Sequence, residues 1–119
     1  MEDILAVLSF DFATSVVLAC DAVKNRPVLK TQLIKSATSI GANIREANYG
    51  CSDADFALKM QIALKECYES QYWLELMVST HALTQEEIAP LVKLCGSIRF
   101  KLIRSIKTVK ERLNGQGDC

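Results

Sequence analysis

The sequence has few of the residues that interrupt helices and few of those that build catalytic sites. Of 119 residues, five are glycine, two are proline and one is histidine. Gly41 and Gly50 stand alone in the sequence and form no glycine-rich phosphate loop. His81 has no partnered nucleophile, so the sequence gives no catalytic triad. We therefore expect a protein that is not an enzyme and needs no cofactor.

The chain also lacks net charge, because 14 Lys and Arg balance 14 Asp and Glu. Its overall charge therefore indicates neither a nucleic-acid partner nor an acidic membrane. Half of the residues are hydrophobic, and the length suits one domain, residues 1–119, with a substantial core. This composition predicts an all-α protein, part of whose apolar surface is buried against other chains.

The cysteines form no recognisable metal or disulfide motif. Their number is odd, none lies in a CxxC pair, and the one histidine is not at ligand spacing from any of them. We expect reduced, mostly buried thiols and no metal. Cys51 is the alternative case, because a thiol beside an expected helix start could be reactive. The five are Cys20, Cys51, Cys67, Cys95 and Cys119.

Residues 4–23 are apolar enough to raise the question of a membrane span. Asp11 and Asp21 interrupt the run, and a carboxylate inside a span is costly. Glu2 and Asp3 precede the run where a signal peptide would carry basic residues. We therefore expect a cytoplasmic protein with no membrane partner.

Apolar residues recur at spacings of three and four over most of the chain. This periodicity predicts an antiparallel up-down-up-down four-helix bundle, because the connections are short. Proline should end the first helix, Gly50 the second, and Ser52 and Thr84 should cap the third and fourth. The expected helices cover about 3–24, 28–48, 53–80 and 85–113, and 114–119 form a frayed tail.

Each expected helix has one apolar stripe. The second helix adds a polar line beside its stripe, made of Ser36, Ser39, Asn43 and Glu46, which we expect to fix its alignment by hydrogen bonds between helices or subunits. The stripes are Leu5, Leu8, Phe12, Val16, Ala19 and Val23; Leu33, Ala37, Ile40, Ile44 and Ala47; Phe56, Met60, Ala63, Cys67, Ser70, Leu74 and Met77; and Leu91, Cys95, Ile98, Leu102, Ile106, Val109 and Leu113.

The third helix has a second apolar face, which a single bundle position does not require. A subunit interface explains this face. The alternative is that the helix lies centrally and that its neighbours cover both sides. An aromatic pair there could also line a small-molecule pocket, although packing is the simpler explanation. The face consists of Leu58, Ile62, Tyr72, Trp73 and Leu76.

The fourth helix carries a basic surface. Residues 84–113 include seven basic and three acidic residues, a net +4. Lys93, Lys101, Arg104 and Lys107 cluster opposite the apolar stripe and form a candidate nucleic-acid surface. Phe100 is the one aromatic residue among them, so binding would be phosphate-driven and not sequence-specific. The alternative is an ordinary solvated helix surface.

Carboxylates on facing helices can hold two iron ions in such bundles. Asn43, Glu46, Glu66 and Glu69 are therefore candidate ligands. No histidine follows Glu66-x-x-Glu69 at the required place, so we expect no metal. Hydrogen bonds to Asn43 and Glu46, and ion pairs of Glu66 and Glu75 with basic residues, are the simpler roles.

Several segments together resemble a known family. The chain is similar to the four-helix-bundle proteins named after the intervening sequence of bacterial 23S ribosomal RNA, which are also labelled a ribosomal protein family. Arg45 and the pair Ala47-Asn48 depart mildly from the family pattern. The matching segments are Ser39-Ile-Gly-Ala-Asn-Ile44, Glu46, Ser52, Asp55-Phe56, Ile62-Ala-Leu-Lys-Glu66 and Tyr72-Trp-Leu-Glu-Leu76.

The resemblance implies a homo-oligomeric bundle, often a ring of five, whose molecular function is unsettled. The fold is also similar to that of the accessory protein of diversity-generating retroelements, a basic pentamer that binds nucleic acid and a reverse transcriptase. We expect a non-catalytic scaffold or adaptor that associates with nucleic acid, or with an enzyme acting on it. The alternative is a protein-protein interaction module with no affinity for RNA or DNA.

Overall fold

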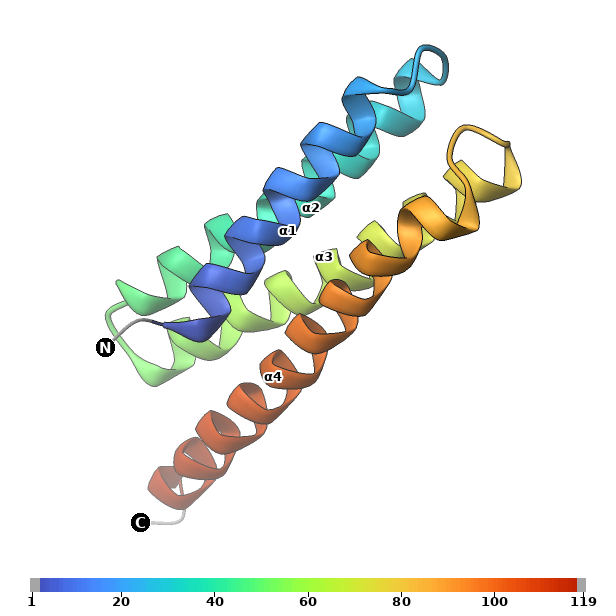
Figure 1. Ribbon diagram of the computed structural model, residues 1–119. Coiled ribbons are helices and arrows are strands. Elements are labelled where there is room, and N and C mark those ends of the chain that lie inside the picture. Colours follow the sequence, from blue (N-terminus) through green and yellow to red (C-terminus); the bar gives the residue numbers. More distant parts are fainter. Residues whose placement is uncertain (1–2, 118–119) are drawn as a thin grey trace.

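The computed structural model describes residues 3–117, which form four helices and no strand. They are α1 (Ile4–Asp21), α2 (Pro27–Asn48), α3 (Asp53–Ser79) and α4 (Gln85–Gly117). Consecutive helices run antiparallel (Figure 1). Within the described range, α1 and α3 each pack against α2 and α4, whereas neither diagonal pair is in contact. The predicted up-down-up-down bundle is therefore confirmed.

The connections between helices follow local sequence signals. α2 begins at Pro27, where a missing backbone N–H costs nothing because no carbonyl would receive it. Arg26, just before it, has a left-handed backbone (φ 66°) that turns the chain. The Arg26 guanidinium donates a hydrogen bond of 3.0 Å to the carbonyl of Thr80. This bond ties the α1–α2 connection to the α3–α4 turn at the same end of the bundle.

Both predicted N-caps are present. The hydroxyl of Thr84 accepts from the backbone N–H of Glu87 at 3.1 Å, and the Glu87 carboxylate accepts from the N–H of Thr84 at 2.9 Å. This reciprocal pair is a capping box. At α3, the Ser52 hydroxyl accepts from the N–H of Asp55 at 3.1 Å. The starts of α3 and α4 are thus fixed by their own local sequences.

The end of α2 differs in mechanism from the sequence prediction. The helix ends at Asn48, and the N–H of Gly50 donates to the carbonyl of Ala47 at 3.1 Å. None of the glycines in the described range has a positive φ, so Gly50 does not act as a left-handed cap. A Cβ atom here would instead collide with the Asp55 carboxylate. A larger residue at this position would therefore require the Asp55 side chain to move.

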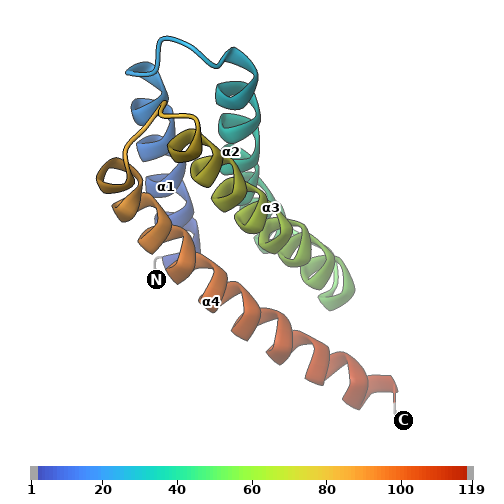
Figure 2. The same cartoon turned by 90° about the vertical axis from the view of Figure 1, so that its right-hand side faces the viewer.

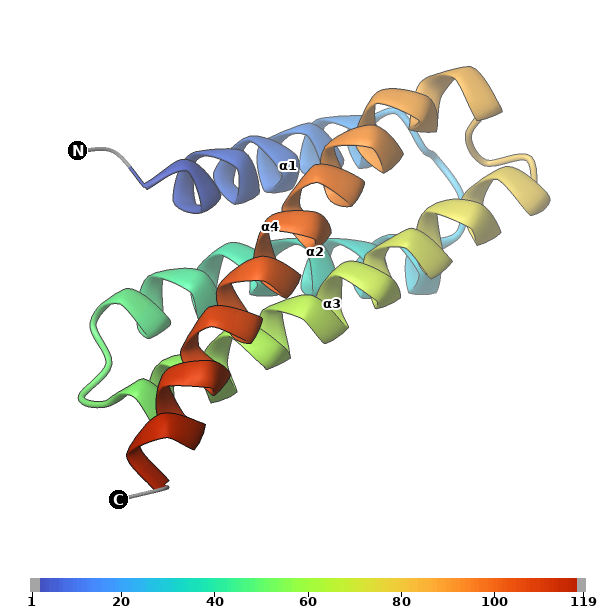
Figure 3. The ribbon, with the colours of Figure 1, turned by 90° about the horizontal axis from the view of Figure 1, so that it is seen from below.

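The predicted frayed tail is helical up to Gly117, which corrects the expected helix end at 113. A glycine weakens a helix by about 1 kcal/mol but does not forbid it. One turn earlier, Arg112 pairs with Asp53 at 3.5 Å. The end of α4 therefore lies beside the start of α3 and away from α1 (Figures 2 and 3). Residues 118 and 119, the remainder of that tail, lie outside the described residues.

The core consists of the predicted stripes. All five stripe residues of α2 are buried, and most of those of the other helices are buried too. The exceptions are half-buried: Leu8, Ala19, Phe56 and Leu113. Each fully buried Leu, Ile or Phe side chain contributes roughly 1.5–3 kcal/mol. Burial of these stripes therefore supplies most of the driving force for folding.

One close approach joins α1 to α2. A Cβ atom on Gly41 would lie 3.2 Å from the hydroxyl oxygen of Ser9, a contact tighter than most. Ser9 is fully buried and donates to the carbonyl of Ala6 at 3.2 Å. Glycine at position 41 therefore lets the two helices pack tightly around a small hydroxyl.

α1 is the one helix in the described range that is long and apolar enough to cross a membrane by length and composition. A core helix of a folded domain passes the same test, and α1 buries Leu5, Phe12 and Val16 in the bundle. Its sides toward solvent are nevertheless strongly apolar.

Candidate interaction surfaces

The polar line of α2 contains one buried hydrogen bond between helices. The hydroxyl of Ser70 on α3 donates to the hydroxyl of Ser36 at 2.9 Å, and Ser36 donates to the carbonyl of Leu33 at 3.1 Å. Both serines are buried. This pair fixes the relative height of the two helices, because sliding would leave the buried Ser70 hydroxyl without its acceptor.

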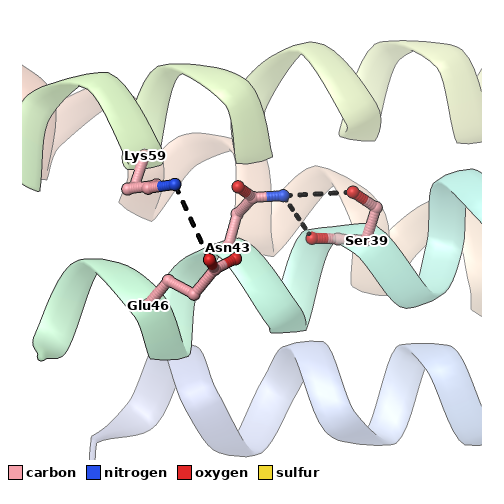
Figure 4. Close-up of polar contacts among 4 residues, drawn as sticks. All are labelled: Ser39, Asn43, Glu46 and Lys59. Carbon is pink, nitrogen blue, oxygen red and sulfur yellow. Dashed lines mark hydrogen bonds and ion pairs between the residues drawn. The ribbon is translucent and has the colours of Figure 1, made fainter.

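The remaining polar residues of α2 act differently from one another (Figure 4). Asn43 donates to the carbonyl and the hydroxyl of Ser39, at 2.9 and 3.1 Å, so both bonds stay within α2. Glu46 pairs with Lys59 of α3 at 3.6 Å. Asn43 and Ser39 therefore do not set the alignment within this chain as the sequence suggested, because a residue one turn earlier satisfies the amide.

The second face of α3 is only partly covered. Leu58 and Tyr72 are 55% and 56% exposed. Ile62, Trp73 and Leu76 are half-buried, and the Trp73 side chain packs against the core. The rings of Tyr72 and Trp73 meet edge to face, with 5.0 Å between their centres. Packing within the bundle thus explains the partial burial of Trp73, whereas Leu58 and Tyr72 remain available to another molecule.

The basic residues of α4 lie on its outer side. Lys93, Arg104 and Lys107 are exposed, and Lys101 is half-buried. The Arg104 guanidinium sits 5.7 Å from the centre of the Phe100 ring, which is itself exposed. The two ion pairs in residues 3–117 join Lys59 to Glu46 and Arg112 to Asp53. The four basic residues are therefore free to meet an anionic partner.

Glu66 and Glu69 lie one turn apart on α3 and interact. Burial, the negative charge of Glu69 and a hydrogen bond to it raise the pKa of Glu66, and nearby Lys65 and Lys35 oppose the shift. Neither Glu66 nor Glu75 forms an ion pair in the described range, and Glu75 instead accepts from Gln71 at 3.4 Å. Residues 3–117 bring together no group of three metal-ligating side chains.

The cysteines follow the composition-based expectation in most cases. Cys20, Cys67 and Cys95 are buried free thiols, and Cys51 is exposed. Cys95 donates to the carbonyl of Cys67 at 3.3 Å, across the α3–α4 contact. A hydrogen bond with Cys95 and burial raise the pKa of the Cys67 thiol. The same hydrogen bond lowers the pKa of the Cys95 thiol, which is enclosed in the core like Cys20 and Cys67. Cys119 lies outside the described residues.

The sequence reasoning missed the outer face of α1. Ile4, Phe10 and Leu18 are all exposed there, and the Arg45 guanidinium lies 5.8 Å from the centre of the Phe10 ring. The available signal was that this helix is apolar on nearly all sides. This signal alone does not distinguish a membrane span from a protein-binding face.

Comparisons with known proteins agree with the fold. A family model described as the 23S rRNA-intervening sequence protein matches residues 4–104. The chain is similar to the crystal structure of a protein with unknown function from the S23 ribosomal protein family of Bacteroides thetaiotaomicron VPI-5482, at 40% identity and a TM-score of 0.82. That match covers 87% of this chain and 99% of the other. No curated protein matches the sequence.

Proposed function

The chain belongs to the 23S rRNA-intervening sequence protein family, and from this premise we propose that it is a non-catalytic, self-assembling cytoplasmic scaffold that binds nucleic acid through α4. The observation that carries the proposal is the unpaired basic surface of that helix. The surface consists of Lys93, Lys101, Arg104 and Lys107.

The composition of this surface supports a particular mode of binding. Lys and Arg recognise phosphate, and each phosphate contact releases counterions, so affinity falls steeply with salt. One exposed aromatic ring, that of Phe100, offers little stacking to single-stranded bases. We propose binding that is sequence-nonspecific and dominated by phosphate contacts.

Self-assembly would strengthen such binding. A single chain presents four basic side chains, which is a weak electrostatic site by itself. In a symmetric ring the surface repeats, and several weak sites on one particle act together through avidity. The exposed Leu58 and Tyr72 support a contact between copies, and the family resemblance favours five subunits.

A gel-shift titration tests the nucleic-acid proposal. Labelled RNA and duplex DNA would be titrated with protein across a salt series. The triple variant Lys93→Glu, Lys101→Glu, Arg104→Glu should bind at least 10-fold more weakly, and its salt slope should fall by about three, one for each lost phosphate contact. The control variant Lys35→Glu, on α2, should leave binding nearly unchanged. No shift at low salt with the wild-type protein would contradict the proposal.

A second function has its own support. The exposed apolar residues Leu58 and Tyr72 on α3 and Phe100 on α4 are typical of a protein-protein interaction module with no affinity for nucleic acid. The zero net charge also favours this function. A wild-type protein that assembles with itself but shifts neither RNA nor DNA at low salt would establish it over the first proposal.

A further inference from the structure

The outer face of α1 is both apolar and acidic. Ile4, Phe10 and Leu18 are 54%, 60% and 62% exposed on this 18-residue helix. Asp11 and Asp21 are exposed on the same side, and residues 3–21 contain no Lys or Arg. The one basic group at this face is Arg45 of α2, which lies over the Phe10 ring, so acidic side chains outnumber it. Large apolar side chains that remain exposed in this way mark interaction sites. The acidic charge further restricts the partner to a surface that is apolar and basic.

A groove on the opposite part of the molecule has these properties. It lies between α3 and the C-terminal half of α4 and has a volume of about 460 Å³. Leu64, Ile103 and Ile106 supply apolar side chains, with Ile103 45% exposed. Lys107, Lys110 and Glu111 lie along the α4 side, so basic side chains outnumber acidic ones by two to one in the lining. An amphipathic helix that inserts apolar residues into such a groove is a recurrent recognition mode.

We propose that the α1 outer face of one copy docks into the α3–α4 groove of the next copy. The occupant is a second copy of this chain because the two surfaces complement each other in charge. Contact between two α1 faces would join two surfaces in which aspartates outnumber Arg45, and contact between two grooves would join two surfaces in which lysines outnumber Glu111. The inference rests on the proposed self-assembly and specifies which surfaces meet.

This pairing has a geometric consequence. A contact between two different surfaces is head-to-tail, so it generates a closed ring or an open filament and not an isolated two-fold dimer. Of the basic surface residues, Lys107 borders the groove, whereas Lys93, Lys101 and Arg104 do not line it. Assembly would therefore leave three of the four proposed phosphate-binding residues free.

A charge exchange within one chain tests the pairing. Multi-angle light scattering would compare wild type, Asp11→Lys, Lys107→Glu/Lys110→Glu, and the variant carrying all three changes. We expect each partial variant to dissociate at concentrations where wild type assembles, and the full exchange to restore assembly. The matched controls Glu86→Lys and Lys35→Glu reverse exposed charges away from both surfaces and should assemble as wild type does. Circular dichroism would establish that every variant is folded.

Cross-linking identifies the surfaces independently. In a background with Cys51→Ser and Cys119→Ser, Phe10→Cys and Ile103→Cys would be prepared as separate proteins and oxidised. We expect a linked dimer when the two proteins are mixed and no dimer from either alone. Wild type that is monomeric throughout would overturn both the self-assembly and this pairing. Assembly that ignores the charge reversals and yields no mixed cross-link would overturn the pairing alone.

Discussion

The buried hydroxyl pair between α2 and α3 gives a sharp energetic prediction. Ser70 donates to Ser36 at 2.9 Å, and neither side chain is more than 4% exposed. Ser36→Ala would leave the buried Ser70 hydroxyl without its acceptor, at a cost of about 1–3 kcal/mol. Ser70→Ala should cost less, about 1 kcal/mol, because Ser36 keeps its bond to the carbonyl of Leu33.

The double variant separates this bond from other effects. With both hydroxyls removed, no polar group is left unpaired. The free energy of unfolding of the double variant should therefore fall by about 1 kcal/mol less than the two single losses added together. Urea unfolding followed by circular dichroism, at one fixed protein concentration, measures all four proteins. Ser97→Ala, at an exposed position on α4, is the control and should lie within about 0.5 kcal/mol of wild type. Single effects that simply add would refute the reasoning.

Three further predictions concern the core, one helix contact and one carboxylate. Leu102→Ala removes a fully buried side chain and should lower the free energy of unfolding by about 2–5 kcal/mol in chemical denaturation. Gly41→Val would crowd Ser9, 3.2 Å from the first added carbon, and should lower the melting temperature, because overpacking costs about 1–3 kcal/mol; an unchanged melting temperature would show that α1 can move away. The pKa of Glu66 is raised in the folded state, so the protonated carboxyl stabilises the fold relative to the ionised one. This contribution is fully present below the ordinary glutamate pKa of 4.5 and is lost as pH rises through the raised value. Glu66→Gln should therefore be more stable than wild type at neutral pH and lose this advantage in acid, as pH-dependent unfolding would reveal.

The sequence predicted those features that depend on local pattern. Spacings of three and four identified the buried stripes, and Thr84 with Glu87 identified a capping box, because both depend on residues within two turns of one another. The sequence predicted a hydrogen bond between helices or subunits at Ser36, but it did not identify the partner residue. Its donor, Ser70, falls in the apolar stripe of α3 by spacing, and one sequence does not show which residues of two helices face each other.

Other features could not be predicted because several geometries satisfy the same pattern. Asn43 could have bonded across the bundle, but Ser39, one turn earlier, satisfied it. The α3–α4 groove depends on how α3 packs against the C-terminal half of α4, and apolar spacing along one helix does not specify this packing. The helix continues through Gly115 because glycine weakens a helix without ending it.

The mass of the particle in solution tests the central claim most directly. Light scattering at micromolar concentration compares the particle with the 13.2 kDa chain. The account predicts a whole-number multiple of that mass, five by family resemblance, held together by the apolar faces that the single bundle leaves exposed. A particle of 13.2 kDa across the micromolar range would contradict it.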